Sequence, residues 1–292
     1  MGYIAIESDK HARRLVRDSH VEVYHVTDVR EVSADMVRQW HAWHREAEVV
    51  LHVSGFPCQD LSSLNAERKG LEGEQSGLFA YTLKIQKFLE EVFTEARCLF
   101  LYENVASMPA EAAAEISTAC GVQPIFFEAS KVSHCRRPRL YWMNFDFKAT
   151  DDWWLTERVV HNGREVCVRG DIKNRAFMPL EKFLLDGAQP ADTDWEAFLT
   201  FTCPEKRSRP GYKPAGIDRC SPEALRRWEK GGWQLAPYQY ERHNLVKDEG
   251  KDYRLVNGDE RLRLLGYPSH YADGLEKMIL RKDMELMKMK LA

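Results

Sequence analysis

Residues 49–59 read Val-Val-Leu-His-Val-Ser-Gly-Phe-Pro-Cys-Gln, an apolar run that leads into a polar segment. Its short run of Val and Leu, bounded by Ser54 and Gly55, predicts a buried β-strand. The polar, glycine-containing residues 60–77 that follow predict a loop. A short apolar strand that ends in such a loop is typical of a parallel sheet in an α/β protein, where helices bury both faces of the sheet.

The segments on either side of this stretch alternate in the same way. Apolar strands separated by amphipathic helices predict a Rossmann-like, doubly wound and mostly parallel α/β sheet. The predicted strands are 3–6, 21–26, 49–53, 98–102, 124–127 and 140–145, and the predicted helices are 11–18, 35–44, 78–93 and 110–119.

The alternation stops near residue 148. Residues 148–244 are rich in Trp, Pro and charge without a repeat, and a short helix is predicted at 261–265 before a charged, Met-rich end. We therefore expect a partial catalytic domain at 1–147, a recognition region at 148–250, and a return segment at 251–292 that rejoins the first domain.

The composition indicates an intracellular globular protein. Hydrophobic residues make up 44% of the chain and charged residues 30%, and no apolar run is long enough to span a bilayer. The seven cysteines are odd in number and irregularly spaced, which argues for a reducing compartment, and none has the spacing of a zinc ligand. We expect no metal, no membrane partner and no signal peptide.

Four reactive side chains follow four predicted strands directly: Glu7, Asp28, Cys58 and Glu103. In an open α/β sheet, ligands bind at the carboxyl ends of the strands. Two acids there suit a nucleoside cofactor, with one accepting ribose hydroxyls and the other an adenine amine. The alternative is that Glu7 and Asp28 only cap the segments that follow, since acids favour helix N-termini.

Cys58 differs from the other cysteines in what surrounds it. Pro57 fixes the turn before it and a polar loop follows, which suits a presented thiolate. A lone cysteine is otherwise more often a buried structural residue. We assign that second interpretation to Cys98, Cys120, Cys167, Cys203 and Cys220.

Three short motifs follow one another along the chain: Gly-Phe-Pro-Cys-Gln at 55–59, Glu-Asn-Val at 103–105 and Arg-Arg-Pro-Arg at 136–139. In this order and spacing they resemble the DNA (cytosine-5) methyltransferase family. The loop at 60–71 looks like that of the eukaryotic de novo type, and residues 3–7 and 266–271 are similar to that type as well. The resemblance covers residues 1–147 well and 253–273 moderately.

The resemblance implies a mechanism for methyl transfer to a cytosine flipped out of duplex DNA. Cys58 would attack ring carbon C6, Glu103 would hydrogen-bond N3 and the exocyclic amine, and Arg139 would hold the base and support Glu103. The implied cofactor is S-adenosyl-L-methionine. The remaining residues implied are Glu7, Asp28 and Pro57 for the cofactor, and Gln59, Ser62, Asn104 and Arg137 for the substrate.

Three departures from the family pattern leave alternatives open. A Phe-x-Gly-x-Gly-type loop, which precedes residue 3 in the family and cradles the cofactor, is not seen, nor is the closing segment of the same pocket. Cys135 stands where many relatives have Gln. A truncated or non-catalytic regulatory relative is therefore an alternative, as is a tRNA cytosine-5 methyltransferase.

A basic stretch at 206–230 holds eight Lys or Arg residues against three acids, in a chain of net charge −3. It includes Trp228, with Trp233 close behind, and lies where the family keeps its target-recognition region. It would contact DNA phosphates, and the alternative is a solvated charged loop. The expected partners are double-stranded DNA and a homologous methyltransferase chain, and the resemblance to the eukaryotic type implies a nucleus.

Overall fold

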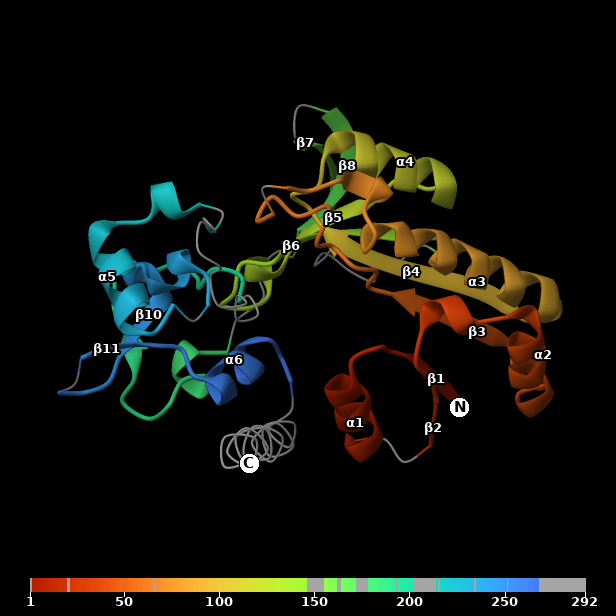
Figure 1. Ribbon diagram of the computed structural model, residues 1–292, viewed down its shortest axis with the longest axis horizontal. Helices are drawn as coiled ribbons and strands as arrows, with labels where there is room; N and C mark the ends of the chain where they lie inside the picture. The colour runs from red at the N-terminus through yellow and green to blue at the C-terminus, as the bar shows by residue number, and fades with distance from the viewer. Residues whose placement is uncertain are drawn as a thin grey trace, which may run out of the picture. The chain divides into compact units, whose positions relative to one another are not determined.

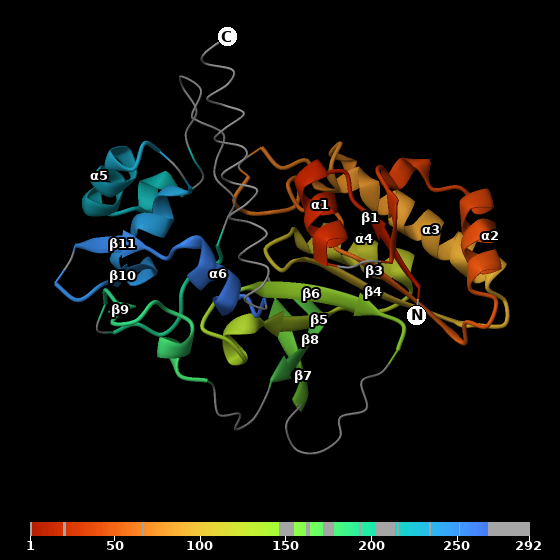
Figure 2. The same ribbon diagram turned by 90° about the horizontal axis from the view of Figure 1, so that it is seen from below.

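The computed structural model describes most of the chain as two compact units (Figure 1, Figure 2). The first unit holds described residues of 2–127 and 139–171, and the second holds those of 128–138 and 178–267. The described residues are 2–19, 22–65, 67–145, 155–161, 164–171, 178–192, 194–201, 214, 216–233, 235–250 and 252–267.

The first unit begins with a small parallel sheet. Strands β1 (Tyr3–Ile6) and β2 (Val23–Val26) pair along their whole length, with Ile6 opposite Val26. Helix α1 (Lys10–Ser19) connects them, as a parallel pair requires. Helix α2 (Ala34–Trp43) then begins at Ser33, whose side chain accepts a hydrogen bond from the Met36 N–H.

The main sheet of the first unit has six strands in the order β3-β4-β6-β5-β8-β7. The pairs β3–β4 and β5–β8 are parallel, whereas β4–β6 and β7–β8 are antiparallel. The bounds are β3 Val49–Ser54, β4 Arg97–Val105, β5 Ile125–Glu128, β6 Pro138–Met143, β7 Leu155–His161 and β8 Arg164–Asp171.

Two helices bury one face of this sheet (Figure 2). Helix α3 (Phe79–Val92) and helix α4 (Ala110–Cys120) pack against the alternating residues of β4 and β6, among them Tyr102 and Trp142. Both of these side chains are fully buried, so two large aromatic surfaces are removed from water on folding. The Trp142 indole N–H donates to the Ser117 hydroxyl at 3.0 Å, so the burial leaves it satisfied.

Helix α3 also belongs to a second cluster of apolar residues. Its Ile85 and Leu89 pack with Val37 and Trp40 of α2 and with Val26 of β2. Since one face of α3 touches the main sheet and another touches the α2–β2 side, this helix links both sheets of the first unit. No described helix is long and apolar enough to cross a bilayer.

The second unit is built from short elements. A three-stranded antiparallel sheet has the order β11-β10-β9, and single turns of 3₁₀ helix lie at 217–219, 237–240 and 242–244. The elements are β9 Gln189–Pro190, α5 Pro222–Lys230, β10 Leu245–Lys247, β11 Tyr253–Leu255 and α6 Gly258–Leu264. Its apolar core includes Phe198, Val246 and Leu264, all fully or almost fully buried.

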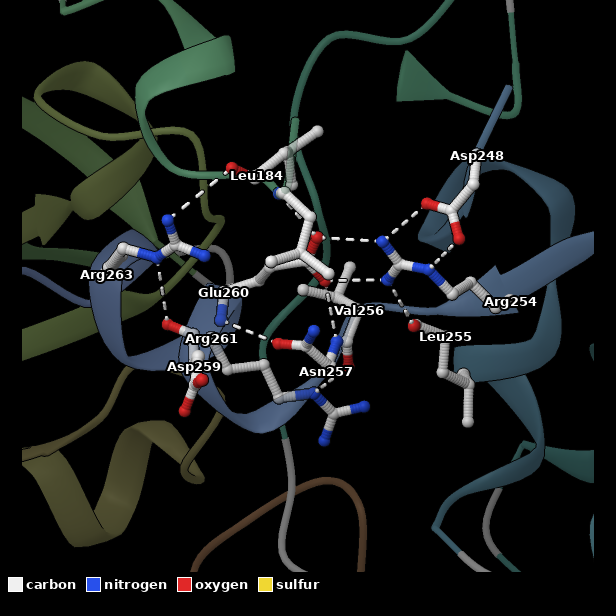
Figure 3. Close-up of polar contacts among 11 residues, drawn as sticks. Leu184, Asp248, Arg254, Leu255, Val256, Asn257, Asp259, Glu260, Arg261 and Arg263 are labelled. Atoms are coloured by element: carbon white, nitrogen blue, oxygen red, sulfur yellow. Dashed lines mark hydrogen bonds and ion pairs between the residues drawn. The ribbon is translucent and has the colours of Figure 1, made fainter. Parts of the chain in front are cut away.

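One fully buried carboxylate organises the second unit around α6 (Figure 3). The Glu260 carboxylate accepts hydrogen bonds from Arg254 at 2.7 and 2.9 Å, and from the backbone N–H groups of Asn257 and Leu185. Asn257 in turn accepts from the Glu260 N–H, which completes a capping box at the start of α6. Asp248 holds the other side of the Arg254 guanidinium at 2.7 Å.

The structure adds one feature that the sequence analysis missed. Strands β7 and β8 form an antiparallel hairpin at 155–171, where only irregular chain was expected, and they extend the main sheet within the first unit. Helix α6 also begins at Gly258 rather than at 261, because the capping box fixes its first turn. The other predicted strands and helices of residues 3–145 are present, with ends shifted by a few residues.

Candidate active site

A side chain of β4 holds the residues before Cys58 in place. Gly55 and Phe56 follow the last residue of β3, and the Asn104 side-chain amide donates to the Phe56 carbonyl at 3.0 Å. The same side chain accepts the Val105 N–H at 2.8 Å, and it is 1% exposed. Asn104 therefore positions the chain before Cys58; its predicted contact with a substrate remains a prediction.

Phe56 anchors this stretch a second time. It is 5% exposed, and its ring lies 4.8 Å, centroid to centroid, from the ring of Phe79 at the start of α3. Pro57 and Cys58 come next and are half-buried, with Cys58 packed against the core cluster that contains Phe56. Two successive anchors in one short turn give the Cys58 backbone a defined position.

Glu103 and Arg139 form a tight ion pair at the same edge of the sheet. In the antiparallel β4–β6 pairing, Val105 lies opposite Arg139 and Glu103 opposite Tyr141, so the two charged residues share one face. The Arg139 Nε donates to the Glu103 Oε1 at 2.6 Å, and the side chains are 11% and 26% exposed. A charge-assisted bond with this little exposure is among the stronger ion pairs of a protein.

The Glu103 carboxylate also lies against the chain that leads to Cys58. A Cβ atom placed on Gly55 would stand 3.5 Å from the Glu103 Oε2. The structure thus brings residues 55–58, Glu103 and Arg139 to one edge of the β3-β4-β6 sheet, as the sequence analysis expected of a site at the carboxyl ends of strands.

Four other cysteines have environments that oppose ionisation of the thiol. Burial raises the pKa of Cys120 and of Cys135 to about 12. Burial also raises the pKa of Cys98 and of Cys220 above the usual 9.0. Since the thiolate is the nucleophilic form, these four are poor candidates for nucleophilic attack.

Cys58 starts a helical turn that opens the polar loop. Its carbonyl accepts the backbone N–H groups of Leu61 at 3.0 Å and Ser62 at 2.8 Å. Gln59, which directly follows Cys58, is exposed. The Ser62 hydroxyl accepts the Leu64 N–H at 3.2 Å. The Gln59 and Ser62 side chains lie beside Cys58 in the sequence, and their predicted contacts with a substrate remain predictions.

The base of this loop is closed by Asp60. Its carbonyl accepts the Gly70 N–H at 3.0 Å, and its Oδ2 accepts the N–H groups of Gln75 at 3.1 Å and Ser76 at 3.3 Å. Gly73 packs so tightly on Asp60 that a Cβ atom there would stand 2.2 Å from the carboxylate. The sequence analysis missed Asp60, whose partners lie ten to sixteen residues further along the chain.

The tip of the loop rests on the segment before α4. The Ser63 N–H donates to the Ser107 hydroxyl, and the Arg68 guanidinium to the Ser107 carbonyl, both at 3.2 Å. These residues line an open hollow of about 660 Å³ together with residues 108–111. The loop is therefore held at its base by Asp60 and contacts Ser107 at its tip.

Glu7 and Asp28 lie at the carboxyl ends of the paired strands β1 and β2. The Glu7 Oε1 accepts the Asp9 N–H at 2.7 Å. Asp28 caps a short 3₁₀ turn and binds the Arg30 side chain, with its closest contact at 2.6 Å. Hydrogen bonds from the Arg30 side chain and backbone lower the pKa of Asp28 to about 2. Capping thus occurs at Asp28, and the predicted cofactor contacts of both residues remain predictions.

Arg137 belongs to the segment 128–138, which groups with the second unit. Its backbone N–H donates to the Glu128 carboxylate at 2.6 Å. The neighbouring Arg136 forms an exposed ion pair with Glu196 at 2.8 Å. The role predicted for the Arg137 side chain at the substrate is not tested by these contacts.

Part of the basic stretch at 206–230 has a structural role. In α5, Arg226 pairs with Glu223 at 2.7 Å and Arg227 donates to the Tyr240 carbonyl. Trp228 is 7% exposed, and its indole N–H donates to the Leu235 carbonyl. The basic residues at 206–213 lie outside the described residues, so the predicted DNA contact remains a prediction.

No protein-family model matches the chain. Among solved structures, the methyltransferase EhMeth of Entamoeba histolytica matches with a TM-score of 0.50 and 12% identity, over 92% of this chain and 78% of that one. A mutant of Spodoptera frugiperda DNMT2 matches with a TM-score of 0.46 and 14% identity, over 92% of this chain and 82% of that one. A protein described as a prophage-encoded DNA modification methyltransferase (E. coli) matches with a TM-score of 0.37 and 20% identity. This match covers 48% of this chain and only 39% of that protein's length.

The likeness to EhMeth, together with the alternating strands and helices, confirms the predicted α/β fold with its Rossmann-like, parallel-rich sheet. At 12% identity this likeness concerns the fold alone.

Proposed function

We propose that this chain is a methyltransferase that transfers a methyl group from S-adenosyl-L-methionine to C5 of a cytosine in double-stranded DNA, with Cys58 as the nucleophile. The observation that carries the proposal is the position of the Glu103–Arg139 ion pair beside Gly55, three residues before Cys58. One thiol, one carboxylate and one guanidinium at a single sheet edge are the groups that this chemistry needs.

The proposed reaction begins with the Cys58 sulfur. As a thiolate it attacks C6 of the flipped base, which forms an S–C6 bond and shifts electron density through C5 toward N3. One oxygen of the Glu103 carboxyl group accepts a hydrogen bond from the exocyclic amine, and the other carries a proton that it donates to N3 as negative charge develops there. The Arg139 Nε lies 2.6 Å from the Glu103 Oε1, and this contact fixes the orientation of the Glu103 side chain before the base arrives.

The cofactor, when bound, supplies the methyl group that C5 accepts. Loss of the C5 proton to water then re-forms the C5–C6 double bond as the S–C6 bond breaks, which releases the product and the Cys58 thiolate and returns the N3 proton to Glu103. Glu7 suits the ribose hydroxyls, because its Oε1 already accepts one N–H and a carboxylate has capacity for further donors. Asp28 would bind the adenine amine by sharing or replacing its contact with Arg30.

Covalent trapping tests the proposal. Duplex DNA that carries 5-fluorocytosine at the target blocks the loss of the C5 substituent, so an active chain with added S-adenosylmethionine should form a protein–DNA complex that survives denaturation. Cys58→Ser should abolish the complex. Cys120→Ser is the matched control and should retain it, because burial keeps the pKa of that thiol at about 12.

The outcomes separate the alternatives. A complex on a 5-fluorocytosine tRNA and not on the duplex would replace the DNA substrate with tRNA. A complex that persists in Cys58→Ser would exclude this residue as the nucleophile. Measurable binding of labelled S-adenosylmethionine or DNA without any complex would leave a non-catalytic regulatory relative.

A further inference from the structure

Two tryptophans near the end of α5 have opposite environments. Trp228 is 7% exposed and belongs to an apolar cluster with Ala224 and Tyr240, whereas Trp233, five residues later, is 47% exposed. Among the described residues, the Trp233 indole joins none of the apolar clusters and has no aromatic partner. An indole without a packing partner is an unusual side chain to expose, since burial of such rings stabilises proteins.

The backbone at Trp233 is also strained. Its φ angle is 56°, in the left-handed region that residues with a Cβ atom rarely adopt, and Leu235 has a φ angle of 61°. Such a conformation persists only where neighbouring groups impose it, and it is concentrated at functional sites. The exposed Trp233 ring gains no packing that would offset this strain, so a role in the fold does not account for the residue.

Contacts on both sides hold the strained turn in place. The Trp233 N–H donates to the Trp228 carbonyl at 2.9 Å, and the Trp228 indole N–H donates to the Leu235 carbonyl at 3.0 Å. Gly231 packs so closely on Tyr240 that a Cβ atom there would stand 2.7 Å from the tyrosine hydroxyl oxygen. The buried Trp228 therefore fixes the turn, and the turn holds the exposed Trp233 in one backbone conformation.

The chain that leads to Trp233 is basic. Helix α5 carries three basic residues against two acidic ones, and the stretch 206–230 as a whole carries eight against three. Arg226 and Lys230, in the last two turns of α5, are both exposed. An exposed aromatic ring beside Lys and Arg side chains is the combination with which proteins bind single-stranded nucleic acids. This charge favours a nucleic acid over an apolar protein surface as the partner of the ring.

We propose that Trp233 is a stacking platform for an unpaired base of a nucleic acid, and that Lys230 and Arg226 contact the phosphates beside that base. The indole face would cover the base without reading its identity, because every base has a π-face. A backbone that is already fixed reduces the entropy lost when the ring is immobilised. The site lies in the second unit and does not depend on the chemistry proposed for Cys58.

Two fluorescein-labelled probes test this site on the full chain without added cofactor. One is a single-stranded oligothymidine of about twelve nucleotides, within the usual size of such sites. The other is an abasic deoxyribose-phosphate chain of the same length, which keeps the charge and lacks the bases. Fluorescence anisotropy measures the dissociation constant of each probe. The parent chain should bind the thymidine probe roughly tenfold more tightly than the abasic one.

Variants then separate stacking from charge. Trp233→Leu should weaken binding of the thymidine probe roughly tenfold, equivalent to about 1.4 kcal/mol, and leave the abasic probe unchanged. Trp233→Phe keeps an aromatic ring and should stay within about threefold of the parent. Lys230→Gln should weaken both probes alike and reduce the slope of log K against log salt by about 0.7. Trp43→Leu is the matched control, at a tryptophan that is 46% exposed in the first unit, and should change neither affinity.

Trp233→Gly separates binding from folding. Glycine adopts a φ angle of 56° without strain, so this variant should unfold in urea at or above the midpoint of the parent. Its affinity for the thymidine probe should nevertheless fall roughly tenfold. A ring that supports the fold would instead lower the urea midpoint when it is removed.

Four outcomes would overturn the inference. The first is a parent chain that does not prefer the thymidine probe, and the second is Trp233→Leu weakening both probes equally or neither. The third is a lowered urea midpoint in Trp233→Gly, and the fourth is an equal effect of Trp43→Leu. None of these measurements involves Cys58 or S-adenosylmethionine, so the trapping experiment stands or fails separately.

Discussion

Replacing Glu260 with Gln removes one buried charge while keeping the side chain's shape. Glu260 is 0% exposed and accepts four hydrogen bonds, two from Arg254 and one each from the N–H groups of Asn257 and Leu185. The amide that replaces it presents an NH₂ group to two of these four donors, because each oxygen of the carboxylate accepts two of the bonds. Breaking a buried ion pair from one side costs about 3–5 kcal/mol.

We therefore expect Glu260→Gln to lower the free energy of unfolding of the second unit by about 3–5 kcal/mol, less if Asp248 compensates for the lost charge near Arg254. Urea unfolding followed by tryptophan fluorescence measures this, because Trp195 and Trp228 report on the second unit. Glu196→Gln is the matched control. Its ion pair with Arg136 has a similar length, 2.8 Å, but Glu196 is 79% exposed.

Glu196→Gln should lower the free energy of unfolding by less than about 1 kcal/mol, since solvent screens exposed ion pairs. Equal losses in the two variants would refute the argument that burial makes the Glu260 contacts strong. The pH dependence supplies a second check. Burial raises the pKa of Glu260, but the hydrogen bonds from Arg254, Leu185 and Asn257 outweigh it, and the net pKa lies below the usual 4.5.

A carboxyl group with a lowered pKa in the folded state stabilises the fold fully above its unfolded pKa and loses that contribution as the pH falls through the folded value. The difference in stability between the parent chain and Glu260→Gln should therefore be constant near neutral pH. It should shrink below about pH 4.5, the usual value. A difference that grows toward acid pH would contradict this assignment of charge.

Three further predictions concern the first unit. Asn104→Ala removes the donor to the Phe56 carbonyl and should cost about 1–3 kcal/mol in chemical unfolding, together with faster amide exchange around residue 56. Ile116→Ala empties a fully buried position of α4 and should cost about 2–5 kcal/mol in the same assay; a loss below that range would mean that the helix collapses onto the sheet. The Asp28 carboxyl should titrate by NMR with a pKa of about 2, and Arg30→Gln should raise that pKa toward the usual 3.8; an unchanged value would exclude Arg30 as its cause.

The part of the fold that follows from local pattern was predictable. The composition and the hydrophobic period predict the strand at 49–54 and the helix at 79–92. The reactive residues that directly follow strands indicated a site at the carboxyl ends of the strands. The sequence held an unused signal for the β7–β8 hairpin: Asn-Gly, the pair of residues at 162–163, is a dipeptide that favours two-residue hairpin turns, and His161 pairs with Arg164 on either side of it. Charged residues in both strands obscured the alternation.

Other features depend on partners far away in the sequence. The amide of Asn104 finds the Phe56 carbonyl 48 residues earlier, and the Glu260 carboxylate meets the Leu185 N–H 75 residues earlier. Nothing in the local sequence distinguishes a buried Glu from an exposed one on a short helix. The separation of β1 and β2 from the main sheet is likewise a property of long-range pairing, which a list of strands cannot reveal.

The closure of the polar loop by Asp60 bears on how this region tolerates changes in length. Because Asp60 binds the N–H groups of Gly70 and Ser76, the described residues from Ser63 to Lys69 form a tip outside the closed base. Inserting residues at that tip costs little, about 0.6 kcal/mol for each doubling of its length. A peptide tag or a protease site placed between Leu64 and Lys69 would therefore leave the thiol where it is, and natural variation in length should collect there.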